Sequence, residues 1–289
     1  MKTKTLMLAL AAPLCFGTGL TLAKPAVAHF PPLFMMLLAY GTVAIITLLT
    51  VREKIKTPWP AMLMISSCAV TVQGALLFLG LKNLEATTAN LVLQTQVPMA
   101  VFLGWLIGGE TLNARKVIGT AIALAGVAIV IGLPHERPPL WPVTLVIIGA
   151  FVWALGQVLI QKFGRDSGIV LLKANSLYSL PQLALVSTLF ETGQLHAVQT
   201  AGLLEWGTMA FVAVVGFYLA YIAWYSLLRR VRMDEAAPFI LLMTPIGLLT
   251  AVVVLGEHMS LVQIIGATVM LFGLAIVNGL IFGAAKITA

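Results

Sequence analysis

Residues 97–132 read VPMAVFLGWLIGGETLNARKVIGTAIALAGVAIVIG and align without a gap with residues 244–279, which read TPIGLLTAVVVLGEHMSLVQIIGATVMLFGLAIVNG. The informative matches are Pro98 with Pro245, Gly109-Glu110 with Gly256-Glu257, and Gly119, Gly126 and Gly132 with Gly266, Gly273 and Gly279. Apolar matches mean little in a hydrophobic chain, whereas prolines, glycines and an acidic residue seldom share one register by chance. The stretch therefore predicts an internal repeat with an offset of 147 residues, the separation of Pro98 from Pro245.

The composition indicates a membrane protein. Hydrophobic residues make up 60% of the chain and charged residues 9%, whereas about a quarter of the residues of a soluble domain are charged. The net charge of +7 does not indicate a nucleic-acid partner, because the basic residues lie in short clusters between apolar runs. Cys15 and Cys68 both fall within apolar runs, and we expect them to be unpaired.

Ten apolar runs approach the length of about 20 residues that a helix needs to cross a bilayer. They lie near residues 5–24, 33–51, 60–80, 88–108, 117–133, 143–161, 169–190, 207–228, 236–255 and 261–282. The connections between them are too short to hold a soluble domain. The predicted fold class is an all-α polytopic membrane protein with ten transmembrane helices.

The lysines and arginines predict how these helices are oriented, because cytoplasmic connections are enriched in both. With the N-terminus inside, thirteen fall on the inner side: Lys2, Lys4, Arg52, Lys54, Lys56, Arg115, Lys116, Lys162, Arg165, Arg229, Arg230, Arg232 and Lys286. The outer side receives Lys24, Lys82 and Arg137. This bias predicts a multi-pass protein of the cell inner (plasma) membrane with both termini in the cytoplasm. Lys173, at one end of the seventh run, is predicted to reach the lipid headgroups.

The repeat divides the chain into residues 1–135 and residues 136–289, each with five predicted helices. Because five is odd, the second half enters the membrane upside down relative to the first. The charges agree: REKIK at 52–56 lies inside, while its counterpart ETGQLHAVQTAG at 191–202 is outside and contains no lysine or arginine. The sequence thus predicts two inverted-topology five-helix repeats, an architecture of transporters that work by alternating access.

The first thirty residues, MKTKTLMLALAAPLCFGTGLTLAKPAVAHF, allow two interpretations. Two lysines, an apolar run and Ala26-Val27-Ala28 resemble the parts of a secretory signal peptide. The apolar run from Thr5 to Ala23 is longer than the 7–15 residues typical of such a signal. Its removal would also leave the first repeat with four helices. We therefore expect a retained first helix, followed by an outer loop at Ala26-Val27-Ala28.

The paired segments GGETL…IGTAIALAGVAIV and GEHMS…IGATVMLFGLAIV, in a chain of five plus five helices, resemble the EamA branch of the drug/metabolite transporter (DMT) superfamily. Within this superfamily the chain looks most like the YddG-type bacterial exporters of aromatic amino acids. The resemblance implies export of small metabolites, with a small-molecule substrate and the lipid bilayer as partners. It also implies that helices one and six face the substrate route. Phe16 of helix one is therefore a candidate for lining the substrate cavity.

The fourth predicted helix contains two amides on one face, Asn90 and Gln94. Pro98 is expected to leave the carbonyl of Gln94 without its usual helical donor, and Pro245 to do the same to Leu241. One interpretation is a pair of broken helices lining a central cavity. The other is a pair of packed kinks with no role in binding.

Aromatic residues supply the other candidates for the cavity wall. Trp153 and Gln157 lie one turn apart in helix six, where they could stack a ring and bond a carboxylate or amine. Tyr218, Tyr221 and Tyr225 lie on one face of helix eight. Phe78 in helix three is the residue that the repeat relates to Tyr225. The alternatives are an ordinary packed tryptophan with an interhelical amide bond, and tyrosines that anchor the helix at the membrane interface.

The acidic residues argue against catalysis and against coupling through a buried carboxylate. No Asp or Glu lies in the middle of a predicted span, and Glu110 and Glu257 fall at helix ends, where a capping role is expected. The four histidines lie in separate connections, so we expect no metal and no cofactor. The favoured function is a monomeric facilitator that exports amino acids. The alternatives are a proton-coupled exporter of another solute, such as a drug or nucleotide sugar, and a polytopic membrane enzyme.

Overall fold

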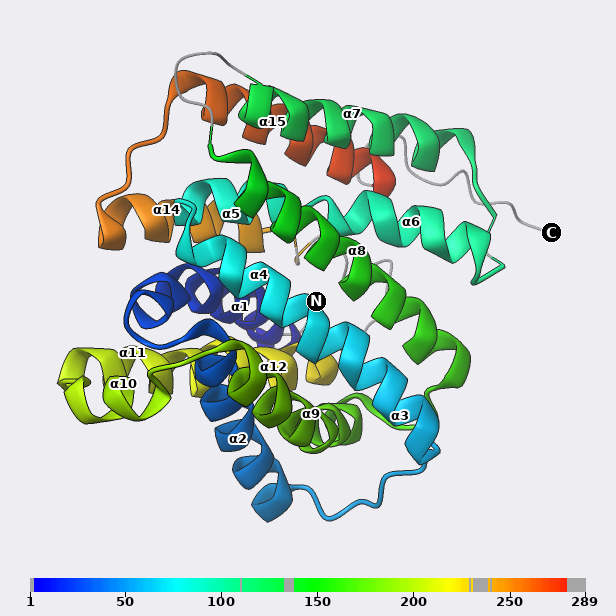
Figure 1. Ribbon diagram of the computed structural model, residues 1–289. Coiled ribbons are helices and arrows are strands. Elements are labelled where there is room, and N and C mark those ends of the chain that lie inside the picture. The colour runs from blue at the N-terminus through cyan, green and yellow to red at the C-terminus, as the bar shows by residue number, and fades with distance from the viewer. Residues whose placement is uncertain are drawn as a thin grey trace.

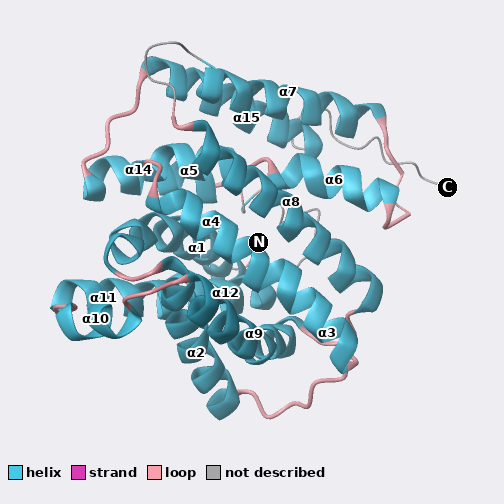
Figure 2. Ribbon diagram, in the orientation of Figure 1, coloured by secondary structure: helices cyan, strands magenta, loops and turns pink. Residues whose placement is uncertain are grey.

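The computed structural model describes residues 3–109, 111–132, 138–228, 230, 239 and 241–279, and all of its regular structure in this part of the chain is helical (Figure 2). The longer helices are α1 (Thr3–His29), α2 (Pro32–Thr50), α7 (Ala114–Gly132), α8 (Leu140–Phe163), α9 (Gly168–Phe190), α14 (Met243–Leu255) and α15 (Leu261–Val277). The remaining helices are α3 (Trp59–Ser66), η1 (Ser67–Val72), α4 (Gln73–Lys82), α5 (Ala86–Leu93), α6 (Gln96–Leu106), α10 (Gln194–Thr200), α11 (Leu203–Phe211), η2 (Val212–Leu219) and α12 (Ala220–Leu228).

Eight helical segments among the described residues are long and apolar enough to cross a membrane. Three of them are composite: α3, η1 and α4 form one segment, α5 and α6 another, and α11, η2 and α12 a third. Two further apolar helices, α14 and α15, are shorter. The predicted class, an all-helical polytopic membrane protein, agrees with this arrangement.

Helix α1 is part of the core and extends further than the sequence suggested. It continues to His29 through Pro25, and Ala26 and Val27 are fully buried. The predicted outer loop at Ala26-Val27-Ala28 is therefore wrong. The physical reason is that these small apolar side chains pack in the main hydrophobic cluster, with residues of α2, α4 and α5.

Helices α7 and α15 lie side by side along the top of Figure 1. They approach through two glycine pairs, in which Gly119 faces Gly273 and Gly126 faces Gly266. A Cβ atom on Gly119 would lie 2.8 Å from the carbonyl oxygen of Gly273, and one on Gly126 would lie 2.7 Å from that of Gly266. Only hydrogen atoms fit in these gaps, so the four glycines set the distance between the two backbones.

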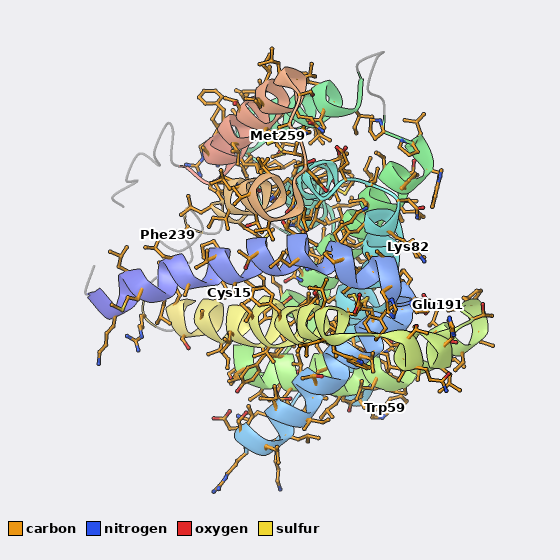
Figure 3. All side chains as sticks on the ribbon, turned by 90° about the vertical axis from the view of Figure 1, so that its left-hand side faces the viewer. Cys15, Trp59, Lys82, Glu191, Phe239 and Met259 are labelled. Carbon is orange, nitrogen blue, oxygen red and sulfur yellow. The ribbon has the colours of Figure 1, made fainter. Side chains whose placement is uncertain are left out.

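Two glutamates hold the starts of helices that are distant in sequence. The Glu257 carboxylate accepts hydrogen bonds from the backbone N–H groups of Ala86 (2.6 Å) and Thr87 (2.8 Å), in the first turn of α5. Glu191 does the same for two N–H groups in the first turn of α2. In Figure 3, Glu191 lies on the same side of the molecule as Lys82, the last residue of α4. The capping role expected for Glu257 is confirmed, and Glu110 lies outside the described residues.

Two lysines satisfy the opposite ends of helices. The Lys24 ammonium donates to the carbonyl of Leu81 at 2.9 Å, in the last turn of α4. The Lys173 ammonium donates to the carbonyl of Val51 at 2.8 Å, just past the end of α2. The Lys173 ammonium is thus held by the chain itself, and its position at the lipid headgroups stays a prediction. Terminal carbonyls lack helical donors and carry the negative end of the helix dipole, so they attract an ammonium group.

Asp166 joins the connection between α8 and α9 to the connection between α2 and α3. Its carboxylate accepts from the backbone N–H groups of Lys56 (2.7 Å) and Thr57 (3.0 Å). Partial burial raises the pKa of the Asp166 carboxyl, but hydrogen bonds from Thr57 and Lys56, together with the Lys56 charge, outweigh this effect. The pKa therefore lies below its ordinary value.

Replacing Asp166 by asparagine is expected to lower the thermal unfolding midpoint of the detergent-solubilised protein at pH 7. A carboxyl whose pKa is depressed in the folded state stabilises the fold above its unfolded pKa, about 3.9, and loses that effect as the pH falls through the folded value. The difference between Asp166→Asn and the native chain should thus shrink below about pH 4. Glu53→Gln, at an exposed carboxylate of the neighbouring connection, is the control. A pH-independent difference would contradict the assignment.

Candidate functional site

The segment that contains Asn90 and Gln94 is broken in its middle. Helix α5 ends at Leu93 and α6 begins at Gln96. The N–H of Val97 donates to the carbonyl of Gln94 at 3.1 Å, a contact three residues apart instead of four. The Gln94 carbonyl has thus lost its usual helical donor, as predicted for Pro98, and accepts from Val97 instead. The chain tightens into a 3₁₀ turn one residue before the proline, and this turn supplies the missing donor.

A matching break precedes α14, at the positions that the 147-residue offset relates to the first break. The N–H of Thr244 donates to the carbonyl of Leu241 at 3.4 Å, so the carbonyl opposite Pro245 is also satisfied. The next turns match as well. Met99 donates to Thr95 at 3.1 Å in the first break, and the related residues Ile246 and Leu242 make the same contact at 3.1 Å in the second.

The two breaks contact each other through a polar pair. The Gln94 side-chain amide donates to the hydroxyl oxygen of Thr244, and both residues are buried. The residues that the offset relates to this pair, Leu241 and Val97, both pack against the apolar cluster between α7 and α15. The polar pair therefore has an apolar counterpart, although the backbone hydrogen bonds of the two breaks match.

Asn90 links α5 to α1, and a threonine links α1 to α14. The Asn90 amide nitrogen donates to the Thr21 hydroxyl at 3.1 Å and to the carbonyl of Ala86 at 2.8 Å. The Thr21 hydroxyl donates to the carbonyl of Gly247 at 3.0 Å. The Asn90 amide oxygen lies 2.7 Å from the place where a Cβ on Gly247 would sit. The site prediction missed Thr21 and Thr244, whose signal was a hydroxyl within an apolar run.

The aromatic candidates occupy separate contacts. The rings of Phe16 and Tyr221 meet edge to face, with centroids 5.1 Å apart. The Tyr218 hydroxyl lies 3.3 Å from that of Thr50, at the end of α2. Phe78 is 3% exposed and packs in the main hydrophobic cluster. The two rings of the first pair thus lie together, while Tyr218 and Phe78 make other contacts.

Helix α8 places Trp153 and Gln157 beside α6. Trp153 is partly buried and packs against a cluster formed by Leu103 of α6 with apolar residues of α8. Gln157 is partly buried, and its amide makes no hydrogen bond to the residues that the structure describes. The predicted residues therefore fall into three places: a polar group at the helix breaks, an aromatic pair on α1 and α12, and the Gln157 amide on α8.

Two composite segments contain π-helix at related positions. The offset moves η1 (67–72) onto residues 214–219, within η2 (212–219). Each π-helix packs on a glycine: a Cβ on Gly216 of η2 would lie 2.9 Å from the Cα of Gly19, and one on Gly156 of α8 would lie 2.9 Å from the nitrogen of Ala69 in η1. Ala69 and Gly216 are themselves related by the offset. π-Helix is rare and often lies at functional sites. Its presence in both halves therefore makes these two segments candidates for a functional role.

Broken helices that meet inside a bundle of apolar helices define a class of protein, the secondary transporters. The chain belongs to the EamA-like transporter family, whose profile matches residues 3–132 and again residues 140–279. The predicted resemblance to this family is confirmed. Family membership makes this a membrane transport protein.

Several curated relatives align over nearly the whole chain. A probable amino-acid metabolite efflux pump of Salmonella typhimurium is 30% identical, with 96% of this chain and 95% of the relative covered. The protein of the same name in Escherichia coli is 26% identical over the same shares. A probable terminal-alkyne amino-acid exporter of Streptantibioticus cattleyicolor is 22% identical over 74% of this chain and 72% of its own length. These names point to transporters rather than enzymes.

A solved crystal structure has the same fold. It superposes with a TM-score of 0.68, covers 96% of this chain and 96% of its own, and is 20% identical in sequence. At this identity the likeness concerns the fold alone.

Proposed function

We propose that this protein exports amino acids, aromatic ones among them, across the cell inner membrane by alternating access. The names of the relatives support export of amino acids. The observation that carries the proposal is the buried contact between Gln94 and Thr244, which joins the two helix breaks. Transporters place substrates where discontinuous helices meet, and this contact puts an amide and a hydroxyl at such a meeting point.

The proposed architecture is ten transmembrane helices in two inverted repeats, residues 1–135 and 136–289, with both termini in the cytoplasm. The matched breaks and matched π-helices support it. The glycine pairs of α7 and α15 support it too, because Gly119 contacts the counterpart of Gly126, and Gly126 contacts the counterpart of Gly119. Such an exchange is what a two-fold axis between the halves would produce. We propose that the working unit is a monomer.

The π-helices supply places at which two segments can bend. A π turn leaves the regular i to i−4 hydrogen-bond pattern, so it resists bending less than an α turn. η2 rests on α1 of the first half, while η1 rests on α8 of the second. Bending at η1 and η2 would therefore move each half against the first helix of the other. This motion is the one that alternating access requires.

The proposed energetics are those of a facilitator that lets its substrate run down a gradient. The described carboxylates lie at helix ends or in connections, and four of them, Asp166, Glu191, Glu205 and Glu257, are engaged by backbone N–H groups. A zwitterionic amino acid would be bound by amides, hydroxyls and aromatic rings. The Phe16–Tyr221 pair supplies such an aromatic surface on α1, the helix that also carries Thr21.

Flux of labelled solutes in proteoliposomes tests the function. The purified protein should carry phenylalanine and tryptophan, and should carry a labelled nucleotide sugar no faster than empty liposomes do. Threonine distinguishes a general amino-acid exporter from an aromatic one. An imposed pH gradient should leave the rate unchanged for a facilitator. Absence of flux for every amino acid would overturn the proposal, and acceleration by the pH gradient would replace the facilitator with a proton-coupled transporter.

Trp153→Ala and Gln157→Ala are each expected to abolish most phenylalanine flux while the protein stays folded. Gln157 has an amide without a hydrogen-bond partner among the described residues, so its removal costs little stability but removes a polar contact for substrate. Size-exclusion profiles and thermal midpoints check the fold. Gln161→Ala, one turn further along α8 at an exposed position, is the control. Native flux in both variants would remove α8 from the substrate path.

A further inference from the structure

Two connections at one end of the molecule form a single surface. The connection between α2 and α3 and the one between α8 and α9 come together at the lower right of Figure 1. Asp166 accepts hydrogen bonds from the backbone of Lys56 and Thr57, and the N–H of Arg165 donates to the Thr57 hydroxyl at 2.9 Å. Lys173 also bonds to the carbonyls of Val51 and Glu53. The two connections are therefore held in place by contacts with each other and with α9.

This joined surface is strongly basic. Its exposed cationic side chains are Arg52, Lys54, Lys56, Lys162 and Arg165. The Asp166 carboxylate is occupied by backbone N–H groups, which leaves Glu53 as the exposed carboxylate of the two connections. Within the described part of the chain, Arg52, Lys54 and Arg165 form no ion pair. Five exposed positive charges held together with one exposed carboxylate favour an anionic ligand.

Exposed aromatic rings border the basic side chains. Trp59, at the start of α3, is 65% exposed, and Phe163, at the end of α8, is 40% exposed. The Lys162 ammonium lies 5.8 Å from the centre of the Phe163 ring. Tryptophan and other aromatic rings at the ends of transmembrane segments lie at the level of the lipid headgroups. The cationic side chains thus start at the depth where the phosphate groups of a bilayer lie.

We propose that these two connections form a binding surface for the headgroup of an anionic phospholipid, with phosphatidylglycerol as the model ligand. The lysines and arginines would bind the phosphate, and Trp59 and Phe163 would contact the upper acyl chains. A lipid fits better than an acidic protein because the apolar rings lie directly beside the charges. Since Asp166 and Lys173 fix both connections, the bound lipid would join the end of α2 to the end of α8. The proposal does not depend on the identity of the transported solute.

Native mass spectrometry of the full-length protein in a neutral detergent tests this surface. Phosphatidylglycerol should bind about tenfold more tightly than phosphatidylcholine, and the double variant Lys54→Gln/Arg165→Gln should lose this preference. The matched control is Lys4→Gln/Lys82→Gln, which removes two exposed positive charges from other places and should bind like the native chain. Glu53→Gln should bind phosphatidylglycerol more tightly.

Two competitors distinguish a lipid from other anions. Glycerol phosphate, which carries the phosphate but no acyl chains, should not displace phosphatidylglycerol at equal concentration. Displacement by soluble polyglutamate would instead assign the surface to an acidic protein. Equal losses in both double variants would show a general effect of net charge. Either of these outcomes, or equal binding of the two lipids, would overturn the proposal.

Discussion

Replacing Gly216 by valine is expected to destabilise the whole transporter. Gly216 lies in η2 directly against α1, and a Cβ there would come within 2.9 Å of the Cα of Gly19. Neither backbone can yield without moving a helix. On the α1 side this is because Gly17, two residues before Gly19, is packed closely against α14. Overpacking of this kind costs about 1–3 kcal/mol and occasionally more. The thermal midpoint in detergent should fall by several degrees, with a loss of monodisperse protein.

Gly207→Val provides the matched control for this substitution. Gly207 lies in α11 of the same composite segment, and a Cβ there would meet no atom within 4 Å. The same change of residue type is made in the same segment, without the clash. The control should unfold at the native midpoint. If both variants lost the same stability, the cause would be the valine itself and not the contact between α1 and η2.

Replacing Gln94 by leucine is expected to reduce amino-acid flux far more than stability. Hydrogen bonds between membrane helices contribute about 0.6 kcal/mol on average, so the loss of the Gln94–Thr244 contact should lower the thermal midpoint only slightly. In the proposed alternating access, the two helix breaks that this contact joins change their relative position. If it is made in only one state and is worth about 1.4 kcal/mol there, its loss shifts the ratio of states about tenfold.

A double-mutant cycle separates this contact from other effects of the substitution. Thr244→Val removes the accepting hydroxyl and keeps the shape of the side chain. If the two residues act through their mutual hydrogen bond, the double variant should transport about as slowly as either single variant. Gln96→Leu is the control, because Gln96 lies beside the break and its side chain makes no hydrogen bond within the described residues. If the reductions in flux of the two single variants multiplied in the double variant, the two residues would act independently, which would contradict the contact.

The sequence predicted the class of fold because the constraints of a bilayer are local. A span shows itself as an apolar run, and the matched prolines lie in the first turns of the helices that follow the two breaks. What happens at the breaks was not predictable in the same way. Pro98 removes one donor, but the 3₁₀ turn that lets Val97 replace it depends on how the surrounding helices pack. The π-helices gave no signal, because no residue type specifies them.

The errors at the site and at the helix ends share one cause, which is contact between residues distant in sequence. Ala26 reads as part of a cleavage motif, yet its small side chain suits a buried position in α1. The contact of Lys173 with the carbonyl of Val51, at the end of α2, was likewise not predicted. Asn90 and Gln94 were identified because amides are costly in an apolar run. Their partners Thr21 and Thr244 were missed because threonine is common in helices.

The glycine contacts between α7 and α15 have a consequence for how such a chain could have originated. Gly119 meets Gly273 and Gly126 meets Gly266, so each position contacts the counterpart of the other. In an oligomer, this reciprocal pattern is the isologous contact of two identical subunits. A five-helix ancestor with these two glycines could have made the same contact by pairing with a second copy inserted in the opposite direction. Gene fusion would then have turned a subunit interface into the interior of one chain.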